Sequence, residues 1–153
     1  MRRRDREISR QEAEAVIDSC DFATLATVNP DGTPYCVPLS ITRDGQWLYF
    51  HCAAEGKKLD NIRYKNKVSI SFVSAVAIPK DDFTCNYRSA IVAGTAEELT
   101  IPSEKIAALK CICERFTKEN MAHFDEAIAK SLSITSVWKV RIDSITGKAK
   151  GII

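Results

Sequence analysis

Residues 33–53, TPYCVPLSITRDGQWLYFHCA, consist of two alternating segments on either side of Asp44-Gly45. In each segment every second side chain is apolar, which is the period of a strand with one buried face. The apolar positions are Tyr35, Val37, Leu39 and Ile41 in residues 33–42, and Leu48, Phe50 and Cys52 in residues 47–53. Because Asp-Gly favours a tight turn, the two segments are predicted to form a β-hairpin.

His51 shares the opposite face of the second predicted strand with Trp47 and Tyr49. Since Leu48 and Phe50 are expected to enter the core, His51 is expected to point away from it. Such a histidine faces either a ligand or an interface with another chain. The sequence pattern leaves both alternatives open.

Pro34 and Pro38 lie within a single predicted strand. Each proline removes a backbone donor, so a central position in a sheet is disfavoured. The strand is therefore expected either at the edge of the sheet or with its backbone facing a bound ligand.

Gly56-Lys57-Lys58 follows the second strand and opens an amphipathic helix that is predicted to end near Arg63. The N-terminus of a helix offers unpaired N–H groups and partial positive charge, and the two lysines add to that charge. This is a candidate phosphate site. Two solvated lysines at the start of a helix are the alternative.

The remaining chain contributes more strands than helices. Ser9 and Glu12 form a capping box that predicts a helix to about Cys20. Gly94, inside a predicted strand, indicates a bulge or a close backbone approach. Further strands are predicted at 22–28, 67–76, 87–97 and 136–143, further helices at 102–116 and 124–132, and a turn at 146–148. Six strands joined mostly by hairpins predict a mainly β fold, an antiparallel six-stranded barrel with flanking helices, forming a single domain over residues 1–153.

The composition of the 153-residue chain is that of an ordinary globular protein, with 45% hydrophobic and 27% charged residues and a net charge of +2. It predicts neither a nucleic-acid partner nor a membrane-spanning helix. Met1–Arg4 is basic, but no apolar run follows it, so no secretory signal is expected. A cytoplasmic location is therefore expected.

Motifs of hydrolytic and metal chemistry are missing from the sequence. The six cysteines contain no Cys-x-x-Cys pair, and His51 and His123 lack ligand spacing, so free thiols and no metal site are predicted. There is no nucleophile elbow, no phosphate-binding Walker loop and no Gly-x-Gly-x-x-Gly.

Several short segments, taken in order, resemble the flavin-binding split-barrel superfamily of pyridoxamine 5'-phosphate oxidase-like proteins, within it the 5-nitroimidazole reductase (Nim-like) branch. These segments are Met1-Arg2-Arg3, Asp5-Arg6-Glu7-Ile8, Leu25-Ala26-Thr27, Gly32 to Leu39, Leu48 to His51, Gly56 to Leu59, Tyr87-Arg88-Ser89, Gly94-Thr95-Ala96 and Ile145 to Lys148.

The resemblance implies a homodimer with FMN bound at the subunit interface. It also implies a role for His51 near the flavin, and for Lys58, with Lys57 beside it, at the FMN phosphate. The backbone expected to border the isoalloxazine ring is that of Pro38, Leu39, Ser40, Ile41 and Thr42. The other residues expected at the site are Tyr87 and Ser89, and Trp138 and Arg141 approaching from the partner subunit.

The activity implied is that of an FMN-dependent oxidoreductase that reduces nitroimidazole or other nitroaromatic compounds. Oxidation of vitamin B6 is not expected, because the tail from Lys148 lacks the arginine-rich segment of the oxidases. The alternatives are a non-catalytic flavin- or haem-binding stress or sensor protein, and a deazaflavin in place of FMN. An OB-like nucleic-acid-binding barrel is disfavoured, because the composition gives little sign of a basic aromatic face.

Overall fold

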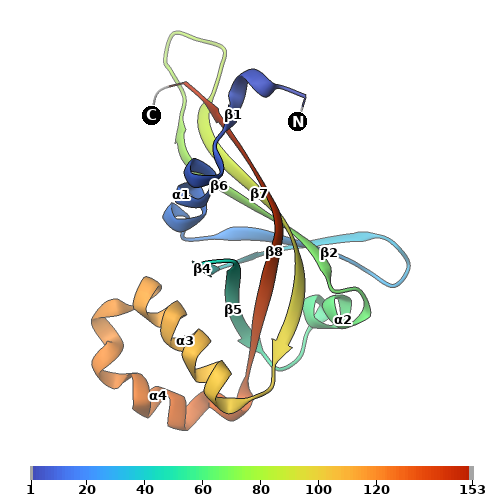
Figure 1. Ribbon diagram of the computed structural model, residues 1–153, viewed down its shortest axis with the longest axis vertical. Helices are drawn as coiled ribbons and strands as arrows, with labels where there is room; N and C mark the ends of the chain where they lie inside the picture. The colour runs from blue at the N-terminus through green and yellow to red at the C-terminus, as the bar shows by residue number, and fades with distance from the viewer. Residues whose placement is uncertain (1, 152–153) are drawn as a thin grey trace.

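The computed structural model describes residues 2–151, and over these residues one eight-stranded antiparallel sheet coils into a split barrel with helices packed around it (Figure 1). The strands are β1 (Glu7–Ile8), β2 (Ala23–Val28), β3 (Pro34–Leu39), β4 (Thr42–Asp44), β5 (Trp47–Ala53), β6 (Lys67–Ala77), β7 (Asn86–Leu99) and β8 (Thr135–Lys150). The α-helices are α1 (Arg10–Ser19), α2 (Lys57–Tyr64), α3 (Pro102–Phe116) and α4 (Phe124–Ser131). Short 3-10 turns lie at Arg4–Arg6, Lys118–His123 and Leu132–Ile134. The predicted fold class, a mainly β antiparallel barrel with flanking helices, is confirmed.

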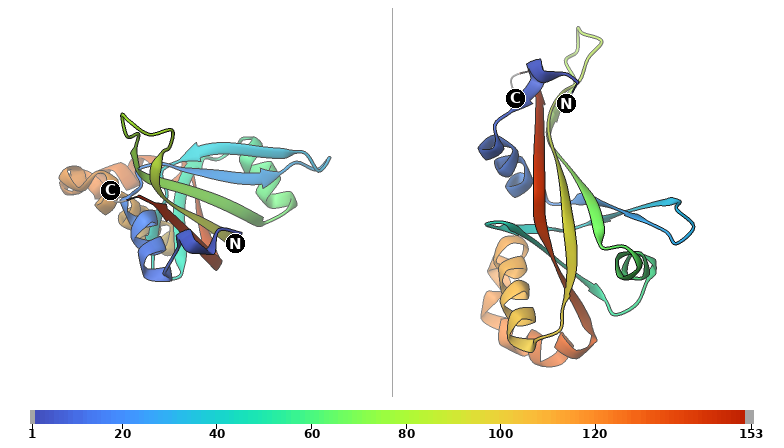
Figure 2. Two further views of the ribbon diagram at one scale, coloured as in Figure 1. Left: turned by 90° about the horizontal axis from the view of Figure 1, so that it is seen from above. Right: turned by 45° about the vertical axis from the view of Figure 1, so that its right-hand side comes forward.

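The sheet has the strand order β3-β2-β6-β7-β8-β5-β4, with β1 paired to β8. The long strands β7 and β8 form a central spine, and the β2–β3 hairpin extends from it as a separate arm (Figure 2). Helix α1 packs near one end of this spine, and α3 and α4 pack near the other.

The predicted strand over residues 33–42 is interrupted at Ser40-Ile41, so the predicted hairpin is only partly correct. Thr42–Asp44 turns back onto β5, with Thr42 opposite Tyr49, whereas Pro34–Leu39 pairs with β2 at the far end of the sheet order. The position of β3 at an edge suits its two prolines, since an edge strand needs N–H donors on one side only. The edge expectation is therefore correct, and it leaves the outer side of β3 open to a ligand.

Strand β8 does not turn at residues 146–148 as predicted. It continues to Lys150, because β1 and β7 pair with this stretch, and Ile8 faces Gly147. A side chain at Gly147 would lie 2.6 Å from Ile8 Cγ1 and 2.7 Å from Ala13 Cβ. The glycine allows this close packing and marks no turn.

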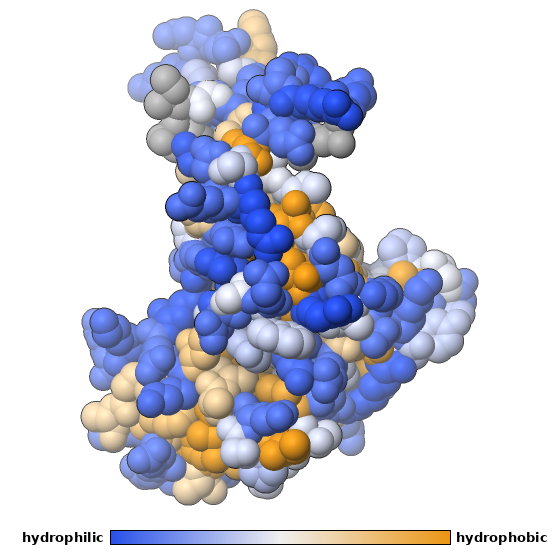
Figure 3. All heavy atoms as spheres, in the orientation of Figure 1, coloured by the Kyte–Doolittle hydropathy of each residue, from blue (hydrophilic) through white to orange (hydrophobic). Residues whose placement is uncertain are grey.

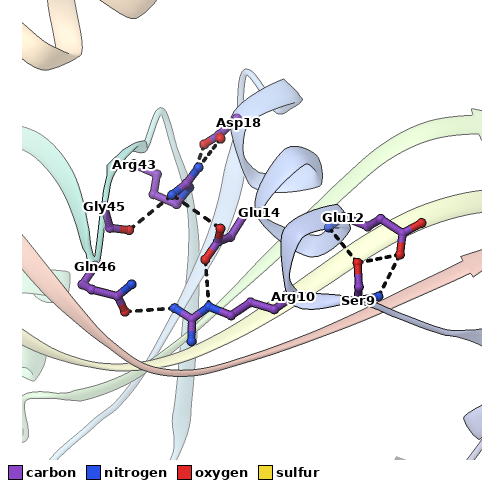
Figure 4. Close-up of polar contacts among 8 residues, drawn as sticks. All are labelled: Ser9, Arg10, Glu12, Glu14, Asp18, Arg43, Gly45 and Gln46. Carbon is purple, nitrogen blue, oxygen red and sulfur yellow. Dashed lines mark hydrogen bonds and ion pairs between the residues drawn. The ribbon is translucent and has the colours of Figure 1, made fainter.

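The inner face of the sheet forms the main core with α1, which buries Ala13, Val16 and Ile17. The capping box is confirmed, since Glu12 N–H donates to Ser9 Oγ and Ser9 N–H donates to Glu12. Polar contacts then fix α1 to the β4–β5 hairpin (Figure 4). Arg43 donates to Asp18, and Arg10 donates to Gln46 Oε1 at 2.9 Å.

Helices α3 and α4 cover the other face of the sheet at the β5–β8 end, around a second cluster of buried side chains. This second core comprises Leu99, Ala108, Leu109 and Val137, with Tyr49, Phe124, Ile128 and Leu132 packed against it. Apolar side chains gather over the α3–α4 half of the molecule, whereas the half around α1 is mainly hydrophilic (Figure 3). No helix within residues 2–151 is long and apolar enough to cross a bilayer.

Candidate functional site

The corner where β5 meets α2 combines an open helix N-terminus with two lysines. Gly56 precedes the helix with φ of 138°, a conformation that side-chain-bearing residues rarely adopt. Its carbonyl accepts from the N–H groups of Leu59 and Asp60 at 2.8 and 3.2 Å. Gly56 has no side chain that could cap the helix, and no other described side chain caps it. The first N–H groups and the positive end of the helix dipole are therefore available to an anion.

The side chains of Lys57 and Lys58 diverge from this N-terminus. The exposed Lys57 ammonium lies 5.4 Å from the centroid of the Tyr35 ring on β3. It also borders a hollow of about 410 Å³, together with Asp31 and Asp60. Burial raises the pKa of the Cys52 thiol, and the charge of half-buried Lys58 nearby opposes that rise. The two ammonium groups thus extend toward different strands, Lys57 toward β3 and Lys58 toward β5.

A buried polar network holds α2 against the β2–β3 hairpin. Asn61 donates to Thr27 Oγ1 at 3.1 Å and to Asn29 Oδ1 at 2.9 Å, and Asn29 donates to Thr33 Oγ1 at 2.8 Å. Buried polar groups are costly unless paired, so this network fixes the angle at which the helix N-terminus is presented. Sequence reasoning missed it, because an asparagine inside an amphipathic helix carries no signal of burial.

His51 lies on the side of β5 opposite the main core. Leu48 and Phe50 are fully buried while His51 is exposed, so its expected direction is confirmed. Its cross-strand partner is Val137 of β8, which belongs to the second core. Desolvation by the neighbouring atoms lowers the pKa of His51, so the imidazole is mainly neutral at pH 7.

Residues 38–42 run from the end of β3 to the start of β4 and become more buried along the chain. Pro38 is exposed, Leu39 and Ser40 are half-buried, and Ile41 and Thr42 are buried. Backbone contact is what the resemblance implies for these residues.

Tyr87 and Ser89 lie on β7, away from α2. Strands β3 and β7 are three strand spacings apart, which is about 14 Å. Arg141 is exposed on β8 and pairs with Asp143 at 3.0 Å. Within one chain, Tyr87 and Ser89 therefore form a group apart from the predicted site residues at β3–β5 and α2, while Arg141 is the cross-strand neighbour of Trp47 on β5.

Trp138 does not fit its predicted place at a partner's site. Its side chain is buried, its ring stacks on that of Phe50, and its indole N–H donates to Ser136 Oγ at 2.8 Å. Arg63 of α2 lies over the outer side of the same ring, 5.9 Å from its centroid. Trp138 alternates with Lys139 along β8, so it faces the main core with Val140 and belongs to its own subunit.

Sequence reasoning also missed an uncharged outer face that crosses five strands. Two cross-strand rows form it, each with one residue from β3, β2, β6, β7 and β8 in that order. The first row comprises Pro38, Thr24, Ser71, Ile91 and Thr146. The second row comprises Cys36, Ala26, Ser69, Ala93 and Ser144. All are exposed except half-buried Ser71 and Ala26. None is charged, although 27% of the chain is. Ser89, one row farther along β7, borders this outer face. Depletion of charge on an exposed face is typical of an interface core.

The split barrel thus carries an open helix N-terminus at α2 and an exposed histidine on the preceding strand, β5. The family model of pyridoxamine 5'-phosphate oxidase matches residues 9–149, and the chain belongs to this family. The resemblance drawn from its sequence segments is thereby confirmed. A search of curated proteins gives no match.

Solved structures are similar to this chain over most of its length. One is a "putative 5-nitroimidazole antibiotic resistance protein" from Bacteroides thetaiotaomicron, 29% identical, with a TM-score of 0.79 over 94% of this chain and 86% of that one. An FAD- and haem-binding protein from Mycobacterium smegmatis is 25% identical, with a TM-score of 0.80 over 94% and 72%. An FAD-binding protein from Mesorhizobium loti is 23% identical, with a TM-score of 0.71 over 95% and 98%, and supports the fold alone.

Proposed function

We propose that the protein is a flavin-dependent oxidoreductase that binds FMN and reduces nitroimidazole or related nitroaromatic compounds. The observation that carries this proposal is the uncapped N-terminus of α2, flanked by Lys57 and Lys58 and set beside the β5 strand that bears His51. The N–H groups and two ammonium groups suit a doubly charged phosphate. The similarity to the nitroimidazole resistance protein supports the substrate class.

The protein's own residues would bind and orient the flavin and the substrate, and the flavin, when bound, would supply the electron pair for the reduction. The backbone of residues 38–42 would border the flavin ring. His51, neutral at pH 7, would hold a hydrogen bond and pass a proton between solvent and the substrate nitro group. Reduction of a nitro group to a nitroso group consumes two electrons and two protons and releases one water.

A homodimer is part of this proposal, because the two groups of site residues lie apart within one chain. The uncharged outer face would pack against a second copy, so that Tyr87, Ser89 and Arg141 of one subunit approach the β3–β5 and α2 group of the other. Neutral and mostly small side chains allow such close packing. The site would then be incomplete in a monomer.

An absorption spectrum of the purified protein, before and after addition of FMN and gel filtration, tests the cofactor. Flavin bands that stay with the protein support the proposal, and chromatography of the released cofactor separates FMN from FAD. A Soret band would favour the alternative of a haem-binding protein instead. The second step is to reduce the bound flavin with dithionite and add a 5-nitroimidazole. Loss of the nitro absorbance with reoxidation of the flavin is expected, and a flavin that stays reduced would contradict the substrate.

A further inference from the structure

A cavity of about 310 Å³ lies under α3, on the face of the sheet opposite the main core. Trp47 and Tyr49 of β5 form its aromatic wall, and Ala107 and Ala108 of α3 face them. Large side chains at these two helix positions would fill the space, so the two alanines leave it open. Half-buried Tyr49 also packs against the second core, and His51, two residues along the strand, is not among the residues that line the cavity.

Negatively charged side chains outnumber positively charged ones around the cavity. Asp44 of β4 and Glu104 of α3 both line it, and Lys139 of β8 is the one cation among its lining residues. The Lys139 ammonium is already engaged, because it lies 3.4 Å from Glu97 Oε1 and 5.2 Å from the centroid of the Trp47 ring. Two carboxylates are left without a cation within the lining.

The titration of the lining residues agrees with this excess of negative charge. Burial raises the pKa of Tyr49, and the charges of Asp44 and Glu104 raise it further. Burial likewise raises the pKa of Cys111, and Asp44 adds to the rise. Both groups are therefore neutral at pH 7, so the charged side chains of the lining are Asp44, Glu104 and Lys139, two negative and one positive.

We propose that this cavity binds a small aromatic ligand that carries a protonated amine, with its ring against Trp47 and Tyr49 and its ammonium group toward Asp44 and Glu104. The volume lies at the lower end of the range for ligand sites, which suits one ring and a short chain. Aromatic walls stabilise a flat ring and also attract a cation. The site is independent of the proposed flavin site, since it uses none of the residues at α2 or at residues 38–42.

Three probes that differ only in their polar end test the proposal: 2-phenylethylamine, 2-phenylethanol and 3-phenylpropionate. Calorimetry on the full-length protein is expected to give an affinity for the amine at least tenfold higher than for the alcohol, and no binding of the acid. The indole N–H resonance of Trp47 should shift with the amine, while that of buried Trp138 stays in place. Equal affinities for amine and alcohol would overturn the proposal.

Variants locate the site. Glu104→Gln should weaken binding of the amine at least fivefold and leave that of the alcohol unchanged, whereas Glu126→Gln on the exposed surface of α4 should change neither. Ala107→Leu should fill the cavity and abolish binding of both, with the fold checked by circular dichroism. Retained binding of the amine in Ala107→Leu, or an unchanged affinity in Glu104→Gln, would overturn the assignment. Flavin binding, measured in parallel, is expected to be unaffected in all three variants.

Discussion

Lys57 of α2 places its ammonium nitrogen 5.4 Å from the centroid of the Tyr35 ring on β3, while the next residue, Lys58, turns toward the Cys52 thiol of β5. Two lysines adjacent in sequence thus reach different strands from one helix N-terminus. A phosphate bound at that N-terminus would have two cations near it, approaching from different strands.

Replacing either Lys57 or Lys58 by alanine should weaken FMN binding. A charge-assisted hydrogen bond contributes about 1.5–3 kcal/mol, which corresponds to a roughly 10- to 100-fold higher dissociation constant. Fluorescence titration with FMN measures this. Riboflavin, which lacks the phosphate, should bind each variant as it binds the wild type, and Lys65→Ala at the other end of α2 should bind FMN normally. Equal losses for FMN and riboflavin would contradict phosphate recognition by these lysines.

His51 should make the stability of the protein depend on pH. Its folded-state pKa lies below the ordinary value of 6.5, so the unfolded chain binds the proton more readily. As far as His51 is concerned, the free energy of unfolding is therefore constant above about pH 6.5. It falls as the pH drops through that value toward the folded-state pKa of His51. Urea denaturation at several pH values should show this fall in the wild type and a smaller one in His51→Gln. The matched control is His123→Gln, on the exposed 3-10 turn before α4. Identical pH profiles for wild type and His51→Gln would show that His51 is not desolvated.

A charge in the middle of the uncharged outer face should break the proposed dimer. Ile91, 42% exposed on β7, is opposite Thr146 and Ser71 in one row of that face. Burying an unpaired ammonium at an interface is costly, so Ile91→Lys should sediment as a monomer and lose bound flavin. Ala127→Lys on the exposed surface of α4 is the control and should leave the assembly unchanged. A wild-type protein that sediments as a monomer would remove the proposed interface itself.

Truncation of Asn61 should destabilise the fold more than an exposed change nearby. Asn61→Ala leaves Thr27 Oγ1 and Asn29 Oδ1 without their buried donor, at a cost of about 1–3 kcal/mol. For a domain of this size, the melting temperature is expected to fall by about 2–4 °C for each kcal/mol. Exposed Asp60→Ala in the same helix turn should change stability by less than about 0.5 kcal/mol. A similar melting temperature for both variants would mean that water replaces the Asn61 amide.

Gly94 should not tolerate a side chain. A Cβ there would lie 2.5 Å from Val140 Cγ1 and 2.6 Å from the carbonyl oxygen of Arg141, and the backbone of β8 cannot move away easily. Gly94→Ala should therefore destabilise the protein by about 1–3 kcal/mol in urea denaturation. Ala93→Gly at the neighbouring exposed position is the control for the altered backbone entropy. An unchanged stability in Gly94→Ala would show that the register shift between Ala93 and Gly94 can relax.

The sequence by itself determined the local elements and the family. The capping box at Ser9, the alternation that buries Leu48 and Phe50 and the start of α2 at Lys57 all follow from short-range rules and are present in the structure. The edge position of the proline-bearing strand is one of the two alternatives that its prolines allow, and the structure has it. His51 turns away from the core for the same reason. These features depend on steric and hydrogen-bonding preferences within a few residues, which a periodic pattern records.

Only the tertiary structure decided which strands meet. In the structure the predicted strand is interrupted at Ser40-Ile41, and its two parts, β3 and β4, lie at opposite ends of the strand order. It buried Asn61 and Trp138, and it aligned uncharged side chains from five strands into one face. Pairing between distant strands depends on which faces can be buried together in three dimensions. That choice is made by packing of the whole chain, so no local pattern in the sequence reveals it.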